Sequence, residues 1–211
     1  MRLDPLSFNK FLSGIGQRVL WQQSFICPCI QDHSGAADTA CPICKGKGRT
    51  WNAPVDGVVG VTAQGVDAKI QDFGAMELGD ITLTVPSDSP LYNLGRFDRV
   101  TLLNSTDVFS RVLTRIPGDN LSDLSVQSIT RVFWRSPDKR SIIDGSLPVV
   151  SANGTLVWGD GGPDFGVQYS VTGIKFDTYF VWQSLPSDRN EHQGAPLPRR
   201  VQARKWDLYS R

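Results

Sequence analysis

Hydrophobic residues near the start of the chain recur at roughly helical intervals, and this spacing predicts a helix within residues 3–20. Phe8, Leu12 and Ile15 are among the residues that set the spacing. Pro5 suits the first turn of such a helix. Two glycines follow before residue 17, and glycine disfavours a helix interior. We therefore expect a short or broken helix.

After residue 55 the pattern changes to short runs rich in valine, isoleucine, threonine and aromatic residues, separated by glycine and proline. Such runs are typical of strands in an all-β domain. The expected strands are Val58–Gln64, Asp80–Val85, Arg99–Leu103, Phe109–Arg115, Val126–Trp134, Gly154–Trp158, Gln168–Thr172 and Lys175–Trp182. The predicted fold is mainly β: a β-sandwich or barrel-like domain with a short N-terminal helix and a zinc-knuckle loop.

Turn residues suggest how some of these strands connect. Gly173 interrupts two alternating runs, so we expect a hairpin over Gln168–Trp182. Asn153 and Gly154 form the other strong turn signal. The tail, residues 199–211, alternates only in part and is expected to form an edge strand.

The change of sequence pattern after residue 55 divides the chain into two predicted domains. Residues 1–56 would hold the helix and a four-cysteine zinc-binding loop, and residues 57–211 would form a β-rich domain with long loops and a C-terminal arm. Two of those loops, residues 86–97 and 184–198, are rich in proline and polar residues.

The charge is balanced, because 22 Lys and Arg residues face 21 Asp and Glu residues. This argues against a protein whose whole surface binds a polyanion. No apolar run reaches the ~18 residues that span a bilayer, so we expect no membrane partner. The N-terminal stretch also lacks the apolar segment and cleavage site of a signal peptide, which favours a reducing cytoplasm.

The four cysteines of the chain form one cluster, Cys27-Pro-Cys29 followed by Cys41-Pro-Ile-Cys44. Structural zinc takes four thiolates in a tetrahedron, and a Cys-x-x-Cys knuckle supplies two of them from one tight turn. Glycines follow the second pair, where they let backbone N–H groups approach sulfur. We predict one structural Zn²⁺ per chain, although the sequence does not distinguish zinc from iron. Four cysteines leave no open position for catalysis.

Other interpretations of the cysteines stay open. They include four free thiols, two disulfides in an oxidising compartment, and a redox pair at Cys41 and Cys44. His33 lies inside the loop and offers a substitute ligand, but a lone histidine in a polar loop is more often exposed. Lys45, Lys47 and Arg49 flank the second pair, where cations would offset the charge of a zinc tetrathiolate.

Motifs for catalysis are missing from the sequence. The two histidines are His33 and His192, and there is no Gly-x-Ser-x-Gly, His-Glu-x-x-His or Walker-type motif. We therefore expect that the protein is not an enzyme and has neither a catalytic residue nor a small-molecule substrate.

A series of short motifs runs along the chain: Arg2–Leu6, Gly16-Gln17, the Cys-Pro-Cys and Cys-Pro-x-Cys-x-Gly-x-Gly elements, Trp51, Asp80–Thr84, Ser89–Tyr92, Phe97–Val100, Leu197–Val201 and Trp206–Leu208. Together these motifs resemble virion proteins that tailed bacteriophages encode near their head–tail genes. Proteins of that family are β-rich and assemble as rings in the neck of the virion. The second cysteine element also resembles the zinc repeats of J-domain chaperones, which use several such repeats.

The resemblance implies a head-to-tail connector, stopper or collar subunit located in the virion neck or tail after assembly in the host cytoplasm. Its partners would be other copies in a hexameric or dodecameric ring, portal or adaptor and tail proteins, and packaged DNA that it contacts non-specifically. In such a ring the two long loops, residues 86–97 and 184–198, are expected to be arms that grip neighbouring subunits. One alternative is a zinc-containing nucleic-acid-binding module with a basic face around Lys45, Lys47 and Arg49. A virion-associated envelope hydrolase is a further alternative.

Overall fold

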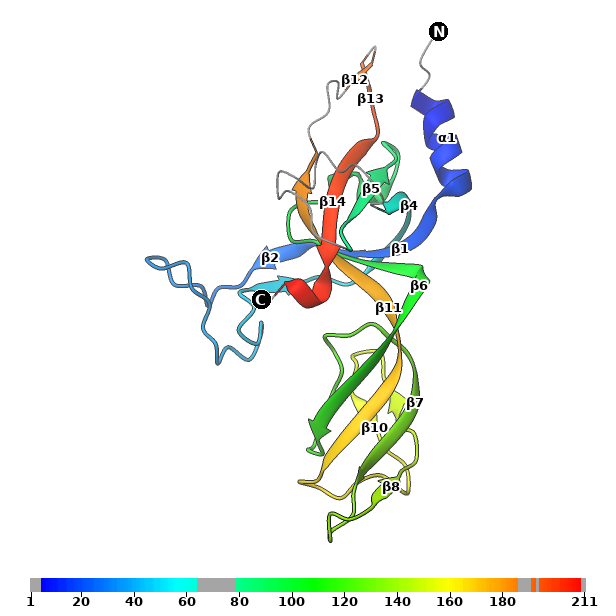
Figure 1. Cartoon of the computed structure of the whole chain (residues 1–211). Helices are drawn as coiled ribbons and strands as arrows, with labels where there is room; N and C mark the ends of the chain where they lie inside the picture. The colour runs from blue at the N-terminus through cyan, green and yellow to red at the C-terminus, as the bar shows by residue number, and fades with distance from the viewer. Residues whose placement is uncertain (1–4, 64–78, 186–190, 193, 210–211) are drawn as a thin grey trace. The chain divides into compact units, whose positions relative to one another are not determined.

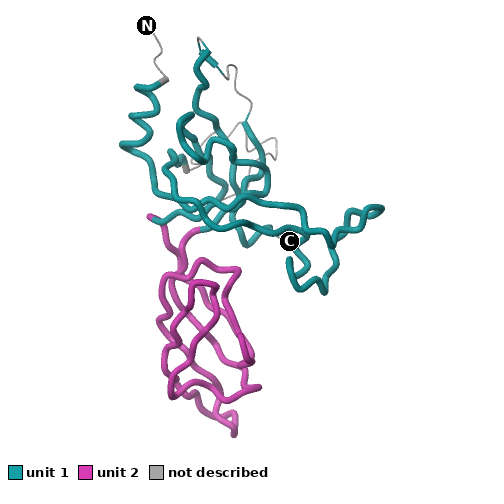
Figure 2. The backbone as a smooth tube through the Cα atoms, turned by 180° about the vertical axis from the view of Figure 1, so that it is seen from behind, with its two compact units in different colours: residues 1–103, 178–211 teal, residues 104–177 magenta. Residues whose placement is uncertain are grey.

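The structure is a computed structural model that describes residues 5–63, 79–185, 191–192 and 194–209. Its described part is mainly β, with one short N-terminal helix, as the sequence predicts. Within that part no helix is both long enough and apolar enough to span a bilayer. Contacts divide the chain into two compact units, residues 1–103 with 178–211 (unit 1) and residues 104–177 (unit 2), as Figure 2 shows.

Unit 1 is built around an antiparallel barrel of six strands (Figure 1). Its strand order is β14-β5-β4-β1-β6-β11, and pairing of β11 with β14 closes the sheet. These strands are β1 (Gln17–Gln22), β4 (Val55–Ala63), β5 (Ile81–Val85), β6 (Arg99–Thr114), β11 (Gln168–Ser184) and β14 (Arg199–Lys205). Closure removes the free strand edges that an open sheet would present.

The barrel core follows the period-2 alternation of its strands. In β1, Val19 and Trp21 are buried, and in β14, Val201 and Ala203 are buried. The other buried members of this core are Val59, Ile81, Leu83, Val85, Leu91, Leu94, Val100, Leu102, Tyr179 and Val181. The hydrophobic effect of this cluster therefore fixes the register of all six strands.

Helix α1 (Pro5–Ile15) is shorter than the predicted range, and residues 3 and 4 of that range lie outside the described residues. Gly16 follows its last residue, and only glycine fits there, because a Cβ would lie 2.5 Å from Cγ1 of Val58 and 2.6 Å from the Leu12 carbonyl oxygen. Residues 17–20, which were also predicted to be helical, instead begin β1. The buried side chain of Leu12 faces the barrel, where α1 contacts β4.

The loop expected to be an arm between Pro86 and Phe97 contains a short 3₁₀ helix, η1 (Pro90–Asn93). Its N-cap Ser89 accepts a hydrogen bond from the Leu91 backbone N–H. Leu91 and Leu94 are fully buried in the barrel core. This segment therefore packs against its own barrel. The second expected arm, residues 184–198, lies partly outside the described residues, which include the short strands β12 (Glu191–His192) and β13 (Ala195–Pro196).

Unit 2 has its own core. Strands β7 (Val126–Arg135) and β8 (Ile142–Asp144) extend the sheet beside β11, and β9 (Val149–Val150) pairs with β10 (Leu156–Val157) across the predicted Asn-Gly turn. The buried cluster consists of Phe109, Leu121, Val132, Leu156, Tyr169 and Val171. Asp119 supports this core from a buried position by accepting a hydrogen bond from the Tyr169 hydroxyl at 2.6 Å, beside Arg115.

The expected hairpin at Gly173 is wrong, because β11 continues through that residue as one strand. A Cβ at Gly173 would lie 2.2 Å from the Ser128 carbonyl oxygen, and the pairing with β7 shifts register there. The glycine thus allows a close approach at a bulge instead of a turn. In the same way, β6 is one strand where two were predicted.

The tail was expected to form an edge strand, but β14 lies between β5 and β11. The reason is barrel closure, which gives β14 a hydrogen-bonding partner on both sides. The predicted domain boundary after residue 56 falls inside β4, and the two compact units follow a different division. Residue 64, the expected end of the β4 strand, lies outside the described residues.

Candidate metal centre

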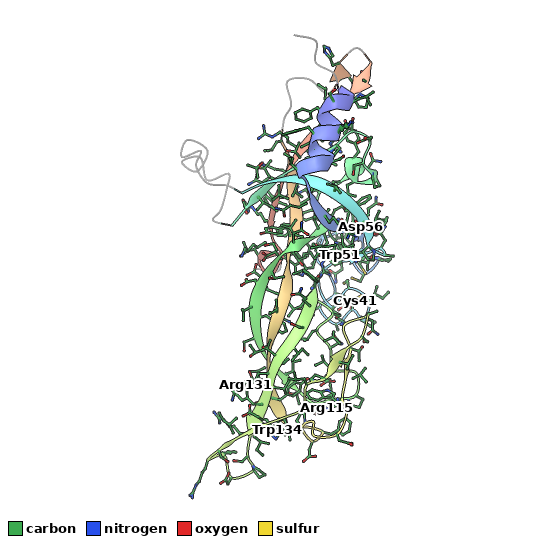
Figure 3. All side chains as sticks on the ribbon, turned by 90° about the vertical axis from the view of Figure 1, so that its right-hand side faces the viewer. Cys41, Trp51, Asp56, Arg115, Arg131 and Trp134 are labelled. Carbon is green, nitrogen blue, oxygen red and sulfur yellow. The ribbon has the colours of Figure 1, made fainter. Side chains whose placement is uncertain are left out.

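A two-stranded ribbon carries the cysteines. Strand β2 (Ser24–Ile26) leads into Cys27 and pairs antiparallel with β3 (Arg49–Trp51), in the register Ser24↔Trp51. The Cys27 backbone N–H donates a 2.9 Å hydrogen bond to the Gly48 carbonyl oxygen. This bond closes the segment between them, residues 27–48, which we call the metal-binding loop. Figure 3 shows the side chains of Cys41 in this loop and of Trp51 in β3.

The second cysteine pair sits on a turn with left-handed backbone. Lys45, Gly46 and Gly48 have φ values of 52°, 79° and 70°, a region that glycine adopts without strain. The Lys45 and Lys47 backbone N–H groups donate to the carbonyl oxygens of Cys41 and Cys44. The Gly48 N–H then points at the Cys44 Sγ at 3.3 Å. The prediction that a glycine after this pair lets a backbone N–H group approach sulfur is therefore confirmed at Gly48.

The first pair is held by a tighter arrangement. The Ile30 N–H donates to the Cys27 carbonyl oxygen at 3.1 Å, which turns the chain directly after Pro28 and Cys29. The backbone N–H of Asp38 donates to the Cys29 sulfur. Asp38 also accepts a bond through its carbonyl oxygen from the Cys41 N–H at 3.1 Å. Residue 38 thus links the two cysteine pairs.

All four sulfur atoms converge, with every pair within 4.8 Å. The Cys27 and Cys41 Sγ atoms are 3.9 Å apart, and those of Cys29 and Cys44 are 3.4 Å apart. A tetrahedral site with metal–sulfur distances of about 2.3 Å has sulfur–sulfur edges of about 3.8 Å. A disulfide needs about 2.05 Å, and the cysteines are free. The four side chains can therefore hold one metal ion.

The thiols influence each other's protonation. Burial raises the pKa of the Cys44 thiol, but hydrogen bonds from Cys29 and the Gly48 N–H outweigh it and lower the pKa to about 7. The pKa of the Cys29 thiol is raised to about 12, because the effect of burial exceeds that of the Asp38 N–H, whose hydrogen bond lowers the pKa. Cys44 is therefore the thiol that ionises first of these two, and thiolates are the form that binds metal.

The predicted ligand set matches the residues that the structure brings together: Cys27, Cys29, Cys41 and Cys44. His33 is exposed, as expected for a loop histidine that is not a ligand. Within residues 27–48, all of which the structure describes, the buried residues are Cys27, Cys41, Cys44 and Gly48. The loop thus has almost no apolar core besides its cysteines.

Sequence reasoning missed the residues that surround this loop. Lys47 and Arg49, which follow the second cysteine pair in the sequence, also contact aromatic rings: Lys47 Nζ lies 5.2 Å from the centroid of the Trp206 ring and the Arg49 guanidinium 4.2 Å from that of Phe97. Burial raises the pKa of the Tyr209 phenol. The charge of Arg49 lowers this pKa, and the charge of Cys44 raises it. Because Trp206 and Tyr209 are more than 150 positions away in the sequence, no local pattern could have pointed to them.

A carboxylate joins this region to the barrel. Asp98 is buried and accepts 2.8 Å hydrogen bonds from Trp21 Nε1, the Ser24 N–H and the Gly95 N–H. Trp51 donates through Nε1 to the Phe97 carbonyl oxygen at 3.1 Å. The ribbon that carries the metal-binding loop is thus bonded at its base to the residues that precede β6.

Comparisons with known proteins add no family to this description. A scan against protein-family models found no match, and a search of curated proteins found no significant match.

Proposed function

We propose that this chain is a structural virion protein of a tailed phage, a ring-forming neck component that joins the portal and head to the tail and lines the DNA passage. The resemblance of its sequence motifs to such proteins supports the proposal. So does the mainly β fold with its closed barrel. The observation that carries it is a set of large apolar side chains exposed at two separate places in unit 1.

The first place is helix α1. Leu6, Phe8, Phe11 and Ile15 are between 42% and 73% exposed, whereas Asn9 and Leu12 are buried against the rest of unit 1. We call these four side chains the helix patch. An apolar surface of this kind on a short helix is typical of a contact that another protein covers.

The second place is the ribbon and the metal-binding loop. Phe25, Ile26 and Ile43 are between 47% and 68% exposed. We call these three side chains the loop patch. A cyclic ring of more than two subunits needs two different surfaces on each chain, since each subunit contacts its neighbours head to tail. The helix patch and the loop patch meet that requirement, and a second copy of this chain is the occupant that we assign to each.

In this proposal the metal is one structural Zn²⁺ per chain. Zinc suits a closed site of four thiolates, has no redox chemistry and adds the folding free energy that the apolar-poor loop lacks. Elemental analysis of protein purified under reducing conditions should find about one zinc per chain. Iron in its place would correct the metal, and no metal at all would refute the site.

The virion role is tested on particles of the phage that encodes the chain. Quantitative mass spectrometry of purified virions should find the chain at about six or twelve copies per particle, the number of subunits in a cyclic ring. Its absence from purified particles would contradict the proposal.

The ring contacts are tested by mixing two variants. Phe11→Ser removes part of the helix patch, and Ile43→Ser removes part of the loop patch. Each variant alone should fail to form rings, and an equimolar mixture should form a discrete heterodimer through the two intact patches, as native mass spectrometry would show. Val149→Ser changes an exposed apolar side chain of unit 2 that belongs to neither patch, and this control should still form rings. Persistent rings in either variant would refute these contacts.

A second candidate, a zinc-containing nucleic-acid-binding module, is favoured by the grouping of cations around the base of the metal-binding loop. Lys47, Arg49, Arg96 and Arg99 each lie within 5.2 Å of the centroid of an aromatic ring in unit 1. This candidate predicts DNA binding whose affinity falls steeply with salt. Failure to bind duplex or single-stranded DNA at low salt would exclude it.

A further inference from the structure

The last described residues of the chain form an aromatic cluster with the base of the metal-binding loop. The 3₁₀ helix η2 (Trp206–Leu208) and Tyr209 follow β14 directly. The Trp206 and Tyr209 rings stack with centroids 5.0 Å apart and an interplanar angle of 13°. Trp51 of β3 meets both rings edge-on, at 5.0 Å and 5.6 Å. We call Trp206–Tyr209 the C-terminal clamp.

The clamp is also fixed to the barrel. Tyr209 meets Phe97 and Phe180 edge-on, at centroid distances of 6.1 Å and 5.2 Å. Edge-to-face contacts of this kind are attractive beyond the area that they bury. The clamp therefore touches the ribbon that carries the metal-binding loop on one side and barrel residues on the other.

A cation from the metal-binding loop contacts the clamp directly. Lys47 lies between the ligand Cys44 and Gly48, and its Nζ is 5.2 Å from the centroid of the Trp206 ring. The Arg99 guanidinium of β6 lies 4.8 Å from the same ring. Trp206 is thus in cation–π contact with the loop and with the barrel at once.

A second series of contacts runs beside the first. Arg49 and Arg96 both lie over the Phe97 ring, at 4.2 Å and 4.7 Å from its centroid. Phe97 itself has a φ of 72°, a left-handed conformation that a bulky residue rarely adopts. Its backbone is held there by a 2.7 Å bond to the Val181 carbonyl oxygen and by the bond from Trp51 Nε1. Such strain persists where surrounding contacts over-determine the position.

We propose that the C-terminal clamp is part of the metal centre: it closes the metal-binding loop onto the barrel, so that metal retention and docking of the clamp are coupled. A loop whose buried residues are three of its cysteines and one glycine cannot hold itself in place when the metal leaves. The clamp restricts the loop from outside through Lys47 and Trp51. The metal in turn fixes the turn from which Lys47 reaches Trp206. Because coupling between two events is reciprocal, each must stabilise the other.

The inference rests on the metal site of the proposed function, and it does not depend on the virion role. It is tested by metal release to a chromogenic chelator, measured on the full chain with circular dichroism to verify that the barrel is folded. Trp206→Ala should release the metal at least about tenfold faster than the wild type, a change of about 1.4 kcal/mol in the barrier to release. Trp206→Phe, which keeps a ring at the position, should restore most of the retention.

Trp158→Ala is the matched control. Trp158 is also half-buried and makes comparable contacts, with the Tyr169 ring at 5.2 Å and the Arg115 guanidinium at 5.1 Å, but all of them lie in unit 2. It should release metal at the wild-type rate. If Trp206→Ala does not fold, Lys47→Ala against Lys47→Arg gives the same test, since arginine keeps the cation over the ring.

The reverse direction of the coupling is tested by following the docking of the clamp through tryptophan emission while the metal is removed. Chelation should shift the tryptophan emission of the wild type to longer wavelength as the indoles gain contact with water, and the shift should be reduced in Trp206→Phe. A wild-type chain that holds no metal would refute the metal site itself. One ion per chain with equal release from the wild type, Trp206→Ala and Lys47→Ala would refute the coupling alone.

Discussion

The barrel and the metal-binding loop belong to the same compact unit, yet they bury different kinds of side chain. The barrel core is made of aliphatic and aromatic residues from six strands, such as Val19, Leu83 and Val201, all fully buried. The loop buries three cysteines and a glycine over 22 residues, from position 27 to position 48. The barrel is therefore stabilised by removing apolar area from water, whereas the loop depends on its four thiols.

One compact unit thus contains two different sources of stability. Contacts between the two include the hydrogen bonds of Asp98, the bond from Trp51 Nε1 to the Phe97 carbonyl oxygen, and the rings around Trp206 and Tyr209. Variants that affect one source should leave the other measurable.

The largest effect is expected from Cys41→Ser. Structural zinc sites in finger peptides have apparent binding free energies of about 10–16 kcal/mol, and a hydroxyl is a poor replacement for a thiolate. Metal content should fall from about one ion per chain to near zero. The loop should become sensitive to limited proteolysis while circular dichroism still reports a folded barrel. Metal retention at the wild-type level would show that the loop does not need the Cys41 thiol to hold its metal.

The next largest effect is the opposite one, in the barrel. Leu83→Ala removes a fully buried side chain from the core and should lower the free energy of unfolding by about 2–5 kcal/mol. Chemical denaturation monitored by tryptophan emission measures this. The folded fraction should still bind about one metal ion per chain. Loss of metal in the folded variant would mean that loop and barrel are not separable.

A smaller effect is expected at the connection between the two regions. Asp98→Asn removes the charge from an acceptor of three hydrogen bonds, which should cost about 1.5–3 kcal/mol of unfolding free energy. Asp56→Asn is the control, because Asp56 pairs with Arg18 on an exposed surface and should change stability little. Equal effects of the two substitutions would contradict the role of Asp98.

The smallest effect is a pH dependence of metal affinity. Metal binds thiolates, so protons compete with it, and the Cys29 pKa of about 12 and the Cys44 pKa of about 7 mean that binding must release protons. Affinity should therefore rise with pH, by at least about tenfold from pH 6 to pH 8. Competition with a metal indicator at the two pH values measures it. The free energy of unfolding of the metal-free barrel should change less between pH 6 and pH 8.

Local sequence patterns were sufficient for much of the fold and for the ligands. Alternation in runs such as Ile81–Val85 predicts strands because one face of each strand must be buried. The Asn153-Gly154 turn was predicted correctly, because Gly154 adopts a φ of 82° that favours glycine. The four thiols were predicted as one cluster because their spacing within a short loop already limits how far apart they can lie.

Other features needed the tertiary structure. Gly173 carries the same local signal as a turn glycine, but it lies inside β11, where β7 passes too close for a Cβ. That β14 closes the barrel is a consequence of pairing with β5 and β11, which no pattern within residues 199–205 contains.

Local sequence patterns were enough to predict most of the strands, the short helix and the clustering of the four cysteines, because hydrophobic periodicity and residue spacing act over a few residues. The tertiary structure alone decided that the barrel closes, that two compact units exist, and that Trp206 and Tyr209 lie against the base of the metal-binding loop. The contacts of Trp206 with Trp51 and Lys47 join residues more than 150 positions apart, and such long-range packing is decided by which apolar and aromatic surfaces can be buried together.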